Sequence, residues 1–97
     1  MIIERKTYRT KHFSEQAVAE FIRQVWNQIE FPHASRISRP IVGPYNVVYH
    51  EMEFESIAER QAFWAAFFAR PEMPEWMDKW KELVETGGGT ELWTLEE

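Results

Sequence analysis

The chain of 97 residues is long enough to form one hydrophobic core and too short to form two. Hydrophobic residues make up 44% of it and charged residues 28%, a composition typical of a folded globular domain rather than a disordered segment. The formal net charge of -5 opposes attraction to nucleic-acid phosphates and to anionic membrane surfaces. We therefore expect neither nucleic acid nor membrane as a partner.

The sequence contains no cysteine, which excludes disulfides, thiolate nucleophiles and cysteine-based metal sites. The opening residues lack the basic segment and apolar run of a secretory signal. No apolar run approaches the roughly 20 residues that a membrane-spanning helix needs. These features predict a cytoplasmic protein.

The first half of the chain predicts a strand followed by a helix. Residues 2–10 mix apolar and β-branched residues with charges at nearly every second position, as in a strand with one side on a core. Ser14 is a candidate cap for a helix from Glu15 to about Ile29. Apolar residues recur in this helix at spacings of three and one, which predicts a single stripe facing the core.

Two further strands are expected in the middle of the chain. Residues 34–42 form the weaker one, because Pro40 cannot donate to a ladder and favours a sheet edge. Gly43-Pro44 predicts a turn, and residues 45–55 then alternate as a strong strand. One face of that strand is predicted to be buried and carries Val48, His50, Met52 and Phe54.

The second half predicts two more helices and a last strand. Ser56 and Glu59 have the spacing of a capping box at the start of a helix that contains the entirely apolar run 62–69. That run must be covered from several directions. Pro71 and Pro74 interrupt the helix, and a shorter helix over 75–85 can act as a lid. Gly87-Gly88-Gly89 is expected to end this helix as a tight turn before a strand over 90–95.

The order of these elements, strand-helix-strand-strand-helix-strand, predicts one α+β domain over residues 1–97 with a ferredoxin-like sheet and helices on one face. The other face of the sheet mixes Thr, Tyr, Trp and charged residues and needs a cover. A second copy of the chain would cover it, which predicts a homodimer.

Two segments carry a resemblance to a known family. Residues 43–50, followed by residues 54–60, resemble the NIPSNAP-like proteins of the dimeric α+β barrel superfamily, with their Gly-Pro-Leu-Asn turn and Leu-Ala-Glu-Arg helix start. Residues 70–76 look like that family's Asp-Pro-Glu-Trp segment with an insertion, and residues 1–10 like its opening strand. The resemblance implies a dimeric α+β barrel. It implies no common reaction, although the wider superfamily includes cofactor-free monooxygenases and haem-degrading enzymes.

His50 is the candidate catalytic residue, because it places a titratable imidazole among apolar side chains on the core face of a strand. The alternative is a buried histidine whose nitrogens are satisfied by its neighbours. Tyr8 and Trp64 are expected to border a cavity beside His50, and the three residues together form the candidate ligand-binding set. Other aromatic residues either line a pocket or simply pack, namely Trp26, Phe63, Phe67, Phe68, Trp76 and Trp80.

Several kinds of chemistry have no support in the sequence. His12 and His33 fall in predicted loops, and His50 and Glu51 point to opposite faces of a strand, so no metal site is expected. The glycine run precedes a strand and not a helix, which disfavours phosphate binding. We expect no cofactor.

Three functional hypotheses remain. The first is a homodimeric barrel protein that binds a small apolar ligand in a cleft between sheet and helices. The second is a cofactor-free monooxygenase acting on an aromatic or polyketide-like substrate, in which His50 assists proton abstraction. The third is a purely structural or regulatory partner. A solvent-open cavity with His50 and a second polar group at its wall would favour an enzyme, and a sealed His50 would favour binding or structure.

Overall fold

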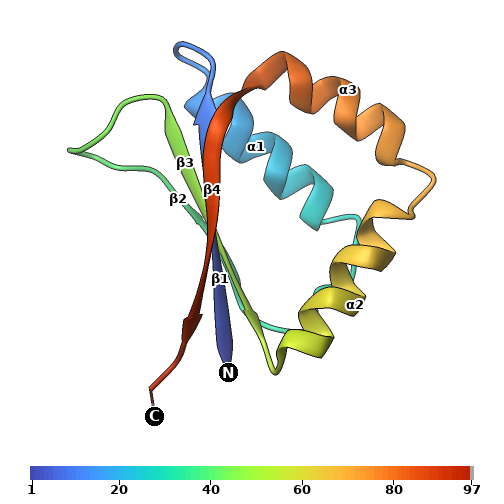
Figure 1. Cartoon of the computed structure of the whole chain (residues 1–97). Helices are drawn as coiled ribbons and strands as arrows, with labels where there is room; N and C mark the ends of the chain where they lie inside the picture. Colours follow the sequence, from blue (N-terminus) through green and yellow to red (C-terminus); the bar gives the residue numbers. More distant parts are fainter. Residues whose placement is uncertain (97) are drawn as a thin grey trace.

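The structure, a computed structural model, describes residues 1–96 and forms a sheet with helices on one face (Figure 1). The elements in chain order are β1 (Ile2–Thr10), α1 (Glu15–Trp26), β2 (Ser35–Ser38), β3 (Val47–Phe54), α2 (Ile57–Phe68), α3 (Met73–Leu83) and β4 (Val84–Thr94). The strands lie in the order β2-β3-β1-β4 and every neighbouring pair is antiparallel. The predicted ferredoxin-like α+β fold is therefore confirmed.

Within residues 1–96, no helix is both long and apolar enough to cross a membrane.

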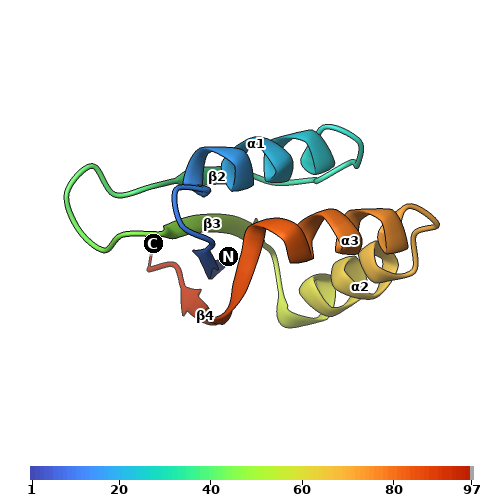
Figure 2. The ribbon, with the colours of Figure 1, turned by 90° about the horizontal axis from the view of Figure 1, so that it is seen from above.

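The core lies between the helices and the face of the sheet that they cover, which we call the inner face. The predicted alternation of β3 is confirmed, since its inner-face residues Val48, His50, Met52 and Phe54 are all buried. The predicted apolar stripe of α1 packs on this face through Val18 and Ile22. Figure 2 shows α1 and α3 side by side on one side of the sheet, while the loop between β2 and β3 projects away from the helices.

The predicted glycine turn is wrong. Helix α3 ends at Leu83, and the chain enters β4 at once, so that Gly87-Gly88-Gly89 lies inside the strand. The pairing of β4 with β1 shifts register between Thr7 and Arg9, which marks a β-bulge. A Cβ on Gly88 would lie 2.1 Å from the carbonyl oxygen of Thr7. Glycine is therefore needed here because two backbones approach closely, and not because a helix has to stop.

Several predicted boundaries also differ from the structure. Helix α1 ends at Trp26, short of Ile29, and the strand predicted from Tyr45 begins at Val47. Strand β2 covers only Ser35–Ser38, because the chain leaves the sheet before Pro40, which has no amide hydrogen to offer a ladder. Helix α3 begins at Met73 and accommodates Pro74 in its first turn, where amide hydrogens have no partner within the helix.

The two predicted helix caps behave differently. Ser14 does not cap α1, because its backbone is not extended and its hydroxyl donates instead to the carbonyl of His12 at 3.4 Å. Ser56 does cap α2, since its hydroxyl oxygen accepts the amide hydrogen of Glu59 at 3.1 Å. The Glu59 carboxylate accepts the amide of Glu55 at 2.9 Å and thus closes a variant of the predicted capping box.

Helix α2 is less covered than its sequence predicts. Phe67 stacks on Trp76 of α3 with ring centroids 5.7 Å apart, so α3 does form part of a lid. In a single chain, however, no residue of α2 is fully buried, and Phe68 is 60% exposed. The predicted cover from several directions is wrong for the single chain, because Ala65, Ala66 and Phe68 of the apolar run stay exposed.

The bulge in β4 gives a test of the glycine assignment. We expect Gly88→Ala to lower the free energy of unfolding by more than about 2 kcal/mol, because its Cβ collides with backbone and cannot be accommodated by a rotamer change. Gly89→Ala is the matched control, since its Cβ would meet no atom within 4 Å. The control should be neutral or stabilising by up to about 1 kcal/mol. Urea unfolding of both variants measures the difference, and equal stability would contradict the assignment.

Candidate functional site

A cavity of about 230 Å³ lies between the inner face of the sheet and the three helices. Its floor comes from the strands, with Lys6 and Tyr8 on β1 and His50 on β3. The helices supply a wall that is mostly aromatic, formed by Phe21, Trp26, Trp64, Phe67, Trp76 and Trp80. The arrangement follows from the sequence patterns, because strand alternation and helical spacing aim these side chains at the same space.

All three residues of the predicted ligand-binding set line this cavity. Tyr8 contacts Trp80 edge to face with ring centroids 4.6 Å apart, and Trp64 reaches the cavity from α2. The aromatic residues considered with them also belong to the lining, except that Phe63 packs between Phe31 and Phe54 behind it. The structure thus brings the set together, while its role in binding stays a prediction.

His50 sits in the floor of the cavity and is only 1% exposed. Its Nε2 atom shares a hydrogen bond of 2.8 Å with the hydroxyl of Ser35 on β2. Its ring meets that of Trp26 edge to face at 4.5 Å. Burial lowers the pKa of His50 to about 4, an effect that the Glu4 carboxylate opposes and the Lys6 ammonium reinforces. The imidazole is therefore neutral at neutral pH.

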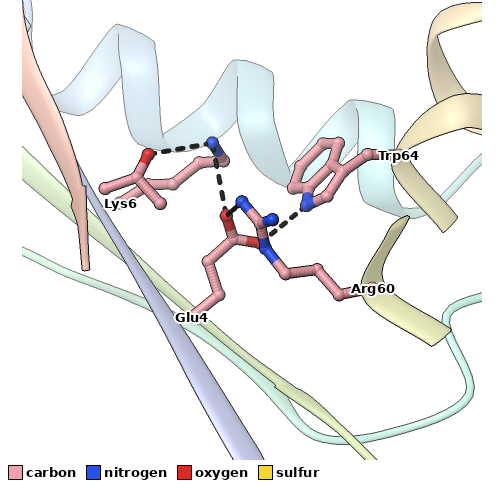
Figure 3. A network of polar contacts seen from close by, with 5 residues as sticks. Glu4, Lys6, Arg60 and Trp64 are labelled. Atoms are coloured by element: carbon pink, nitrogen blue, oxygen red, sulfur yellow. Dashed lines mark hydrogen bonds and ion pairs between the residues drawn. The ribbon is translucent and has the colours of Figure 1, made fainter. Parts of the chain in front are cut away.

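A buried ion pair next to the cavity was not predicted from the sequence (Figure 3). Glu4 on β1 is fully buried and accepts hydrogen bonds from Trp64 Nε1 at 2.6 Å and from Arg60 Nη2 at 2.8 Å. The Lys6 Nζ atom lies 3.5 Å from the same carboxylate. Burial raises the pKa of Glu4, but the hydrogen bonds from Arg60 and Trp64 outweigh it, so the net shift is downward and the carboxylate stays ionised.

The signal that could have revealed this pair is the parity of β1. Alternation puts Glu4, Lys6 and Tyr8 on one face, and an ionised group on a buried face needs a charged partner. The first turn of the second predicted helix offers Arg60 as that partner. Arg60 is 56 residues away from Glu4 in the sequence, so no local sequence pattern could identify it as the partner.

Lys6 and Tyr8 are the hydrogen-bond donors of the cavity floor, and a third donor, on Trp26, is buried. The Lys6 ammonium donates to the Thr90 hydroxyl at 3.2 Å and lies 4.8 Å from the centre of the Trp64 ring. Burial, together with the negative charge of Glu4, raises the pKa of Tyr8 well above its ordinary value, so its hydroxyl keeps its proton. The indole N–H of Trp26 is buried and has no hydrogen-bond partner within residues 1–96.

The described part of the chain contains no cluster of three or more histidine, aspartate or glutamate side chains that could hold a metal ion. The chemical resources of the cavity are its aromatic wall, a neutral imidazole, one ammonium group and the neutral hydroxyl of Tyr8.

The sheet order and the helices on one face define a ferredoxin-like α+β fold. An antibiotic biosynthesis monooxygenase of solved structure shares this fold with a TM-score of 0.71 and 12% identity, with all of both chains covered. The sequence model of the NIPSNAP family matches residues 3–88, and the chain belongs to that family.

Solved NIPSNAP structures agree with this assignment. A family member from Agrobacterium tumefaciens has a TM-score of 0.84 at 15% identity, covering 99% of this chain and 93% of its own. A NIPSNAP domain protein from Burkholderia xenovorans has a TM-score of 0.82 at 15% identity, covering 99% and 95%. No curated protein matches the sequence significantly. At these identities, the structural likeness describes the fold alone.

The pKa of His50 gives a prediction for stability against pH. Unfolded histidine takes up a proton near pH 6.5, whereas folded His50 does so only near pH 4, so falling pH favours the unfolded state within that window. We expect His50→Gln, which can keep the bond to Ser35, to flatten the pH dependence by up to about 1.4 kcal/mol per pH unit below pH 6.5. His12→Gln, at an exposed position, is the control. Denaturant unfolding from neutral to acidic pH measures both, and an unchanged slope in His50→Gln would contradict the prediction.

Proposed function

We propose that this NIPSNAP-family protein binds a small aromatic or otherwise flat apolar molecule in the cavity between β1, β3 and the helices. The observation that carries the proposal is the composition of the cavity wall, in which aromatic side chains surround a few isolated polar groups on the floor. This is the usual composition of small-molecule sites, whose volumes are roughly 300 to 1,000 Å³. The volume of about 230 Å³ favours a small ligand.

The competing proposal is a cofactor-free monooxygenase in which His50 is the general base. A base works best when its pKa lies near the working pH, and the pKa of His50 is lowered to about 4. Its Nε2 atom is also engaged by Ser35. The likeness to an antibiotic biosynthesis monooxygenase, at 12% identity, concerns the fold. Ligand binding is therefore the better supported of the two functions.

We also propose that the protein acts as a homodimer, in which the outer faces of two sheets pack together. The helices leave this face uncovered (Figure 1). Trp93 is 55% exposed and pairs across strands with Ile3, while Arg5 lies 4.4 Å from the centre of the Tyr49 ring. Such a mixture of aromatic and arginine side chains is typical of protein interfaces.

The absence of cysteine fits a cytoplasmic setting for the protein, which we also propose.

Filling the cavity tests the binding proposal. We expect the wild type to bind 2-naphthamide, a neutral compound of two fused rings, and Val25→Phe to weaken binding by at least about tenfold, because Val25 lines the cavity and phenylalanine occupies its space. Val42→Phe is the matched control at a fully exposed position. Isothermal titration calorimetry measures both. Equal binding by the two variants would place the ligand elsewhere, and Met77→Trp, at the cavity edge, replaces Val25→Phe if that variant fails to fold.

Charge insertion tests the homodimer. We expect light scattering to give the mass of a dimer for the wild type and a shift toward monomer for Trp93→Glu, because the new carboxylates would be buried between the two sheets. Phe68→Glu is the control, since Phe68 is similarly exposed but lies on the helical side of the molecule. A wild-type monomer, or equal effects of the two changes, would overturn the proposed interface.

A further inference from the structure

The cavity carries a positive charge that its lining does not balance. Among the described residues that line it, Lys6 is the only one with a formal charge, because His50 is neutral. The adjacent Glu4 carboxylate is engaged more closely by Arg60, at 2.8 Å, than by Lys6, at 3.5 Å. Two cations thus share one carboxylate, and the floor has a local excess of one positive charge.

The Lys6 ammonium retains capacity to bind a ligand. It has three N–H donors, of which one is directed at the Thr90 hydroxyl at 3.2 Å. The approach to Glu4 at 3.5 Å is too long to be a strong charge-assisted hydrogen bond. The side chain is 20% exposed, so the ammonium is partly desolvated, and it has no closer ionic partner among the described residues than the carboxylate that it shares with Arg60. An acceptor that enters the cavity would supply a closer partner.

The neighbouring polar side chain of the floor favours the same kind of ligand atom. Tyr8 follows Lys6 on the same face of β1, and its hydroxyl keeps its proton. That hydroxyl can donate a hydrogen bond to a ligand oxygen, as the ammonium can. An anionic oxygen group is the complement of an ammonium beside a neutral hydroxyl.

We propose that the ligand is an aromatic monocarboxylic acid, whose ring packs against Trp64 and Trp26 and whose carboxylate pairs with Lys6. This inference rests on the proposed binding function and specifies the chemical class of its ligand. A monocarboxylate matches a single excess charge, whereas a phosphate would bring nearly two negative charges. The guanidinium that would suit a phosphate, that of Arg60, is already bound to Glu4.

The test compares two ligands of equal shape and different charge. Wild-type protein is titrated by calorimetry at neutral pH with 2-naphthoate and with its neutral isostere 2-naphthamide. We expect the carboxylate to bind at least about tenfold more tightly, as for one charge-assisted hydrogen bond in a partly desolvated site. Lys6→Met should abolish the preference for the carboxylate over the amide. Lys81→Met, which removes an exposed lysine of α3, should retain it.

The outcomes separate this inference from the binding proposal. Equal wild-type affinity for the two compounds, or an undiminished preference in Lys6→Met, overturns the acidic ligand and leaves an apolar binding cavity intact. Absence of binding for both compounds overturns both proposals. Circular dichroism and thermal unfolding establish that each variant is folded, and Lys6→Gln serves in place of Lys6→Met if the latter is not.

Discussion

The carboxylate of Glu4 is ionised and fully buried on the inner face of the sheet. It lies on β1, one of the two central strands, and is held by Arg60 and Trp64, two residues one turn apart on α2. An ionised carboxylate without these partners would cost several kcal/mol in such a position. The ion pair therefore fixes where α2 begins against β1, and the Trp64 indole that bonds to the same carboxylate becomes a wall of the cavity. One interaction sets both the orientation of a helix and the shape of the site.

The same interaction explains how a small domain keeps a polar floor under an aromatic cavity. Glu4 binds Arg60, which does not line the cavity, and Lys6 is the charged group among the described residues of the lining. Burial, together with the negative charge of Glu4, raises the pKa of Tyr8 and keeps its hydroxyl protonated, while burial lowers the pKa of His50 and keeps it neutral. The polar groups thus have distinct and fixed states, with one cation among neutral donors and acceptors. Such preorganisation favours binding of one kind of ligand over general apolar adhesion.

What could be predicted from the sequence was local periodicity. The stripe of α1 and the alternation of β3 each arise within one element, and each put the expected side chains on the core. The function of the glycine run was not accessible in this way, because Gly88 is required by the approach of Thr7 from a distant strand. The Glu4–Arg60 pair could not be predicted for the same reason, because its two residues are far apart in the sequence. In both cases the decisive contact joins residues that are close only after the sheet has formed.

The residues of the candidate site, too, could be predicted from the sequence only in part. Tyr8, His50 and Trp64 could be assigned to one cavity because strand parity and helical spacing determine the direction of each side chain. The importance of Lys6 could not, because its charge matters only once Glu4 is known to be engaged by another cation. The identity of a polar group is read from the sequence, whereas its free capacity for a ligand depends on tertiary partners.

A crystal structure of the protein grown with 2-naphthoate would show directly whether Lys6 binds the carboxylate of the ligand. We expect the rings to lie in the cavity against Trp26 and Trp64, with a carboxylate oxygen within hydrogen-bond distance of Lys6 Nζ. A ligand bound outside the cavity, or one inside it whose carboxylate points away from Lys6, would contradict the proposal.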